Sequence, residues 1–69
     1  MTTSGVVVTV AGEMSAALRR EFDDFEVAIG RSVTRIRSAS VDPSVLSGLI
    51  HRVESLGLEL LEVQREHDL

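Results

Sequence analysis

The chain has 69 residues, carries a formal net charge of −4 at pH 7 and contains no cysteine. A domain this small buries only about 60% of the surface that its unfolded chain exposes, so it usually needs a disulfide, a metal or a partner chain. The lack of cysteine excludes disulfides and thiolate metal sites. We therefore predict a single domain over residues 1–69, ordered over about 5–66 and stabilised by a partner chain.

The charge and the aromatic content argue against nucleic-acid binding. The chain is acidic and has only two aromatic residues, Phe22 and Phe25, so it lacks both a basic footprint and stacking rings. A basic face confined to three arginines between residues 31 and 37 is the one arrangement that would change this expectation. The apolar run Val6–Val10 is too short for a membrane span or a signal-peptide core. We expect a cytoplasmic protein that binds neither nucleic acid nor membrane.

The first third of the chain predicts a strand and then a helix. Val6–Val10 is almost purely β-branched, which favours a strand. Because side chains alternate across a strand, Val7 and Thr9 share one face and the other three residues share the opposite face. From Glu13 to about Asp24, apolar residues recur every three or four positions, which predicts a helix.

The middle of the chain predicts two further strands. Phe25–Ile29 gives a weak strand signal, Gly30–Arg31 indicates a turn, and Ser32–Val41 indicates a third strand. In the third strand we expect Ile36 to point inward and the arginines on either side of it to point outward, with a bulge near Ala39. The alternative is that residues 25–30 form a loop.

The last third predicts a capped helix that leads into a strand. Asp42 can cap the first free N–H groups, Pro43 suits the first helical position, and Gly57 suits a left-handed C-terminal cap. We expect the helix from Pro43 to Leu56 and the last strand from Leu58 to Arg65.

The element order β-α-β-β-α-β predicts an α+β domain of the ferredoxin-like type. In this arrangement a four-stranded antiparallel sheet carries both helices on one face. If residues 25–30 form a loop, the order becomes β-α-β-α-β. In both cases we expect a core between sheet residues and helix residues: Val6, Val8, Val10 and Ile36 against Leu18, Phe22, Leu49 and Val53.

With both helices on one side, the other face of the sheet is uncovered. A contiguous exposed apolar area usually marks an interaction surface. We expect this face, or a sheet edge, to mediate association with a larger protein or with a second copy, most simply as a symmetric homodimer. The residues that we assign to the interface are Val7, Thr9, Val33, Leu58 and Leu60, with Leu61 and Val63 as the alternative to the last two.

No group of residues in the sequence indicates catalysis. Ser47, His51 and Glu54 share a helix face but lack a nucleophile turn and an oxyanion hole, and the acidic residues of 21–26 lack the spacing of a calcium loop. Gly12 and Glu13 form a weak candidate ligand-binding site, because backbone N–H groups at a helix start can hold a carboxylate or phosphate. We expect no enzyme activity, no metal and no cofactor.

The closing phrase LSGLIHRVESLGLELLEV, residues 46–63, resembles the end of an ACT-type domain. In that family a helix of the form LxxLxxLxxLGL leads into a strand of alternating Leu, Val and Glu. Gly12 matches the glycine before the family's first helix, whereas Glu13 stands where a Leu is expected. The resemblance implies dimerisation through sheets, with a small effector such as an amino acid bound at the interface and an attached enzyme under its control.

The sequence is therefore compatible with three functions. The leading one is a non-catalytic interaction or oligomerisation module, and the second is an effector-binding regulatory domain. The third is a small enzyme with a pocket between helices and sheet, which would need a polar group directed into the core.

Overall fold

The computed structural model of the chain describes residues 4–40 and 42–67. Its elements are β1 (Ser4–Ala11), α1 (Ala16–Arg19), the 3₁₀ turn η1 (Arg20–Phe22), β2 (Glu26–Ile29), β3 (Val33–Ser38), α2 (Pro43–Ser55) and β4 (Leu60–His67). Residues 26–29 form a strand, so the alternative in which this segment is a loop is wrong.

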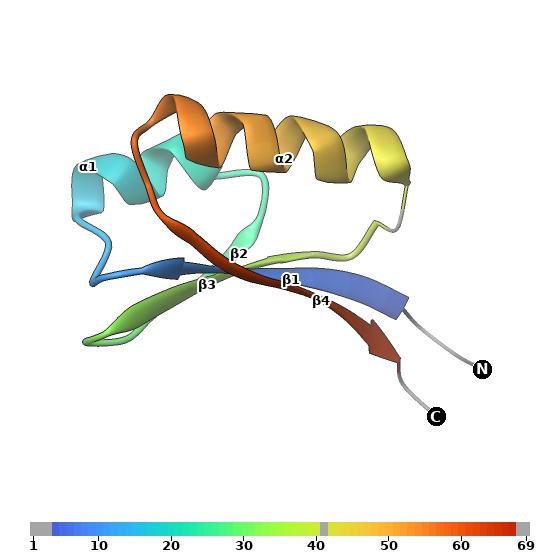
Figure 1. Ribbon diagram of the computed structural model, residues 1–69, viewed down its shortest axis with the longest axis horizontal. Helices are drawn as coiled ribbons and strands as arrows, with labels where there is room; N and C mark the ends of the chain where they lie inside the picture. The colour runs from blue at the N-terminus through green and yellow to red at the C-terminus, as the bar shows by residue number, and fades with distance from the viewer. Residues whose placement is uncertain (1–3, 41, 68–69) are drawn as a thin grey trace.

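The four strands form one sheet in the order β2-β3-β1-β4, and every neighbouring pair is antiparallel. Both helices lie on the same side of the sheet, and the opposite side is uncovered (Figure 1). The molecule is thus a small α+β domain in which β2 and β4 are the edge strands. Within the described residues, no helix is both long and apolar enough to cross a membrane.

The ferredoxin-like prediction is wrong, and the segment between β1 and β2 overturns it. The helix expected from Glu13 to Asp24 is only four residues of α-helix followed by a three-residue 3₁₀ turn. The start is delayed because Ser15 is the N-cap, its hydroxyl accepting from the Leu18 N–H at 3.2 Å. We therefore describe the fold as a four-stranded antiparallel sheet with one full helix, α2, and one short helical segment.

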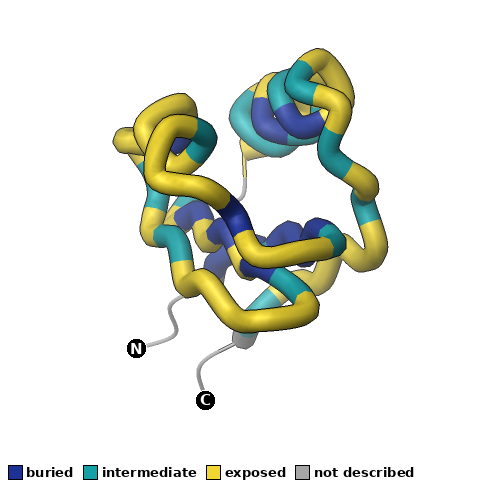
Figure 2. Tube along the Cα trace, turned by 90° about the vertical axis from the view of Figure 1, so that its left-hand side faces the viewer, coloured by how far each residue is buried: buried dark blue, intermediate teal, exposed yellow. Residues whose placement is uncertain are grey.

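The core lies between α2, the short helical segment and the near face of the sheet. Figure 2 shows the buried residues gathered on the sheet and on the inner side of α2. The buried apolar residues are Val6, Val8, Val10, Met14, Phe22, Ile36, Leu49 and Val53. Seven of these were predicted. Met14 was not, and Leu18 packs against the core only as a partly buried residue.

The last strand begins two residues later than the sequence predicts. Gly57 adopts a φ of +76°, as expected for a left-handed cap, and the Leu58 N–H donates to the Val53 carbonyl at 3.1 Å. Leu58 therefore completes the end of α2 and does not start β4. The sheet irregularity lies between Thr9 and Val10, where β1 meets β4, and not near Ala39. Val41, which the predicted bulge was to turn inward, lies outside the described residues.

Arg52 of α2 anchors the acidic end of the short helical segment. Its Nη1 donates to the Glu21 carbonyl at 2.7 Å and to Asp24 Oδ1 at 3.0 Å. The guanidinium carbon also lies 5.8 Å and 5.6 Å from the ring centroids of Phe22 and Phe25. The hydrogen bond from Arg52 to the Asp24 carboxylate holds the pKa of Asp24 below its ordinary value of 3.8.

Candidate interaction surface

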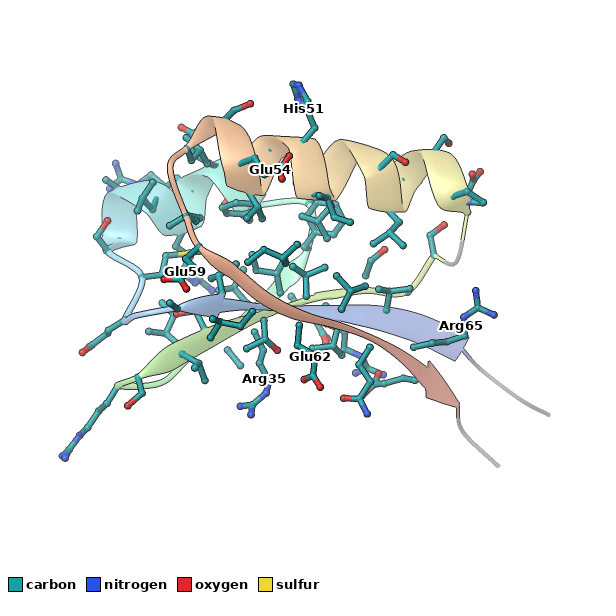
Figure 3. All side chains as sticks on the ribbon, viewed as in Figure 1. Arg35, His51, Glu54, Glu59, Glu62 and Arg65 are labelled. Carbon is teal, nitrogen blue, oxygen red and sulfur yellow. The ribbon has the colours of Figure 1, made fainter. Side chains whose placement is uncertain are left out.

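The uncovered face of the sheet is charged. Residues directly opposite each other in an antiparallel pair share a face, and Thr9 of β1 is paired with Arg35 of β3 and Glu62 of β4. Figure 3 shows Arg35 and Glu62 pointing away from the helices. The neighbouring pairs place Arg37 and Gln64 beside Val7.

Three of the five predicted interface residues lie on this face. Val7 and Val33 are half-buried there, and Thr9 is only 7% exposed. Leu58 and Leu60 do not lie on the uncovered face, because both are partly buried against the core on the helix side. The expectation of a contiguous apolar face is therefore wrong.

Arg37 balances two of the acidic side chains on the uncovered face. Its Nε lies 2.7 Å from Glu66 Oε1, and its Nη1 lies 3.4 Å from Glu26 Oε1. The Glu66 Oε1 atom is buried and takes no hydrogen bond of good geometry within the described residues, so the Arg37 charge compensates it. Charges of both signs also line the open groove beside β2, which includes Arg19 and Phe25. On this face Arg37 thus compensates Glu26 and Glu66, whereas Arg35 and Glu62 form no ion pair with another described residue.

The β4 edge of the sheet has a different character. It is eight residues long and, in the described part of the chain, has β1 as its single neighbour in the sheet. Two large apolar side chains on it are exposed, Leu61 by 48% and Val63 by 41%. These are the residues that the sequence offered as the alternative to Leu58 and Leu60.

A shallow apolar groove separates β4 from α2. It is lined by Val6, Pro43, Leu46, Val63 and Arg65. Val63 faces the helix side of the sheet, because it is paired with the fully buried Val8. Apolar contact surface and unpaired strand backbone therefore occur together at this one edge.

The candidate ligand site at Gly12 and Glu13 is closed by the chain itself. Gly12 has a φ of +90°, its N–H donates to the Ser32 carbonyl, and its own carbonyl accepts from the Thr34 hydroxyl at 2.9 Å. The next residue but one, Met14, donates its N–H to the same Thr34 oxygen at 3.1 Å. Sequence reasoning missed Thr34, because its partners lie about 20 residues away along the chain.

The polar side chains considered for catalysis, Ser47, His51 and Glu54, are all exposed on α2 and line no buried site. His51 points away from the sheet at the outer side of α2 (Figure 3). The two buried hydroxyls of β3, Thr34 and Ser38, are both used to hold loops, since Ser38 Oγ accepts from the Ser40 N–H at 3.1 Å. Within residues 4–40 and 42–67, no cluster of three or more His, Cys, Asp or Glu side chains could hold a metal ion.

Comparison with known proteins adds a family assignment. No curated protein and no solved structure is detectably similar to the chain. One family, described as "Domain of unknown function (DUF8691)", has a sequence model that matches residues 6–64, which is most of the chain and includes all of α1, β2, β3 and α2. The ACT-type resemblance is not among these matches, and the chain belongs to the DUF8691 family.

Proposed function

We propose that this chain is a non-catalytic self-association module and that its contact element is the free edge of β4. The observation that carries the proposal is that an eight-residue edge strand also exposes two large apolar side chains, Leu61 and Val63. An edge strand presents a row of unpaired N–H and C=O groups, which a second strand can satisfy.

Long edge strands are usually protected against such pairing, and β4 is only partly protected. Common devices are proline, charged side chains, a bulge or a very short strand. The β4 segment LLEVQREH carries three charged residues and a register shift beside Thr9, but it has no proline and is eight residues long, whereas the other edge strand, β2, has only four residues. Association through β4 is therefore favoured over association through β2.

The size of the domain supports the same conclusion. The chain has no disulfide and, in its described part, no candidate metal cluster. A partner strand is the remaining way to extend so small a core. The uncovered face is a weaker candidate than the edge because it is charged and Arg37 already pairs with two of its carboxylates.

The test is the mass in solution, measured by light scattering over a concentration series. We expect the mass to rise from that of one chain toward twice that value as concentration increases. Val63→Arg should keep the protein monomeric, because it places a charge at the contact edge. A single-chain mass at every concentration would overturn the proposal.

The sheet supplies a matched control for this variant. Ile29 lies on the opposite edge strand and is 40% exposed, against 41% for Val63. We expect Ile29→Arg to leave the mass unchanged. Val7→Arg should also leave it unchanged if the edge, and not the uncovered face, makes the contact.

A further inference from the structure

We infer that the partner at β4 is a second copy of this chain, paired antiparallel about a two-fold axis that passes through Val63. This inference rests on the proposed function and adds the register of the pairing. It follows from which side of the sheet each β4 residue faces and from the charges that each register would bring together.

The alternation of β4 limits the registers that a two-fold axis allows. In a continuous antiparallel sheet, residues directly opposite each other share a face. Glu62, Gln64 and Glu66 lie on the uncovered face, since they are paired with Thr9, Val7 and Gly5 of β1. Val63 and Arg65 lie on the helix side, opposite Val8 and Val6. The axis must therefore pass through a residue and not between two residues.

An axis through Leu61 would place Leu60, on the helix side, opposite Glu62, on the uncovered face, so the alternation excludes it. Like charges exclude most of the remaining registers. An axis through Glu62, Arg65 or Glu66 places that residue opposite its own copy. An axis through Gln64 places Glu62 opposite the second copy's Glu66. Like charges directly opposite each other destabilise a strand pair.

The axis through Val63 brings no like charges together among these residues. It places the two Val63 side chains against each other on the helix side, so that the exposed surface of each Val63 is covered, and it places Leu61 opposite Arg65 of the second copy. On the uncovered face it places Glu62 opposite Gln64 of the second copy, and the Gln64 amide can donate to the carboxylate. This contact occurs twice because of the symmetry. The apolar groove between β4 and α2 then lies beside the axis in each copy.

The interface formed in this way is small. Specific interfaces of standard size bury about 1,200–2,000 Å², and a contact between two eight-residue strands lies at the lower end. We therefore expect a reversible dimer whose population rises with protein concentration.

The first experiment alters the charge at residue 64. In the Val63-centred register, Gln64→Lys places a lysine opposite Glu62 twice and should tighten the dimer several-fold. Gln64→Glu places two carboxylates opposite each other twice and should weaken it several-fold. If the axis passed through Gln64, both variants would weaken the dimer, because each would put like charges face to face.

The second experiment uses the absence of cysteine from the chain, which allows clean single-cysteine variants. Residues opposite each other in an antiparallel pair have Cα atoms about 4.5–5.5 Å apart, within the range of a disulfide. Val63→Cys should therefore form a disulfide-linked dimer rapidly under mild oxidation. Gln64→Cys is the control, since its two copies would lie roughly 8 Å apart, too far for a disulfide without movement.

The outcomes separate this inference from the proposed function. A dimer by light scattering that is tightened by Gln64→Lys and cross-linked only through Cys at 63 supports both. A dimer that shows the opposite pattern overturns the register and leaves self-association intact. A wild-type chain that remains monomeric, with no enhanced cross-linking at 63, overturns both.

Discussion

Thr34 shows how one small polar side chain holds this domain together. Its side chain is fully buried on the helix side of β3. The hydroxyl donates to the Gly12 carbonyl and accepts from the Met14 N–H, so it satisfies two backbone groups of the loop between β1 and α1. A buried backbone group without a partner is costly, and Thr34 removes that cost at two positions.

We predict that Thr34→Val lowers the free energy of unfolding by about 1–3 kcal/mol. The valine has nearly the same shape but leaves the Gly12 carbonyl and the Met14 N–H unsatisfied. Thr34→Ser keeps the hydroxyl and should cost less. Urea denaturation followed by circular dichroism measures both variants, and an equal or smaller loss for the valine variant would show that these hydrogen bonds are not important.

At the level of elements, Arg52 links α2 to the short helical segment. The carboxylates of Asp23 and Asp24 stand at the C-terminal end of that segment, where the helix dipole disfavours negative charge. Arg52 compensates by ion pairing with Asp24, by bonding the Glu21 carbonyl and by covering the ring of Phe22. The tertiary contact thus stabilises an end that local sequence leaves weak.

Arg52→Ala should therefore destabilise the protein by about 1–2 kcal/mol, through lost hydrogen bonds and lost cation–π contact. Arg31→Ala is the matched control. It removes the same charge from an exposed turn where the structure shows no ion pair to another described residue. Thermal unfolding of the two variants should show a clear shift for Arg52 only. Equal shifts would mean that net charge, and not the contact, is responsible.

The two ends of α2 predict a response to acid. The Ser44 N–H donates to Asp42 Oδ1 at 2.9 Å and holds the pKa of Asp42 below its ordinary value of 3.8, as Arg52 does for Asp24. A carboxyl group whose pKa is lowered by folding adds stability above its ordinary pKa, and this stability is lost as pH falls through the folded value. We therefore expect the melting temperature to decrease as the pH is lowered from about 5.

The double variant Asp24→Asn and Asp42→Asn should show a flatter acid limb than the wild type. Asparagine is a good N-cap residue, so the helix start is kept while the titrating groups are removed. Melting curves between pH 7 and pH 2 make the comparison. Parallel curves for the two proteins would place the acid sensitivity in other carboxyl groups.

At the level of the whole molecule, the contrast between the sheet's face and its edge determines where a partner can bind. On the uncovered face, Arg37 forms ion pairs with Glu26 and Glu66 and so compensates these two carboxylates. The β4 edge exposes backbone and apolar side chains together. Because binding of a second copy to the folded state alone stabilises that state, the melting temperature of such a protein rises with its concentration.

The sequence placed Val7, Thr9 and Val33 on the uncovered face correctly because alternation along a strand is a local property. It also predicted that Arg35 and Arg37 point outward, which their exposed side chains confirm, but it expected the face as a whole to be apolar. The mixed charge of the face depends on strand pairing, which places Glu62 of β4 beside Thr9 and Arg35 from a position far away in the chain. Long-range pairing also explains why Leu61 and Val63, and not Leu58 and Leu60, are the exposed apolar residues of the last segment. The turn after Gly57 and the irregularity at Thr9 set the register of β4.

The sequence by itself determined the first strand, the start and end of α2, and most of the core, because each depends on neighbours a few residues away: β-branched alternation, a capping Asp42 and a left-handed Gly57. Only the tertiary structure decided what Thr34 holds and which residues the β4 edge exposes. These features depend on contacts between segments 20 or more residues apart, and one shift of register changes which side chains face outward.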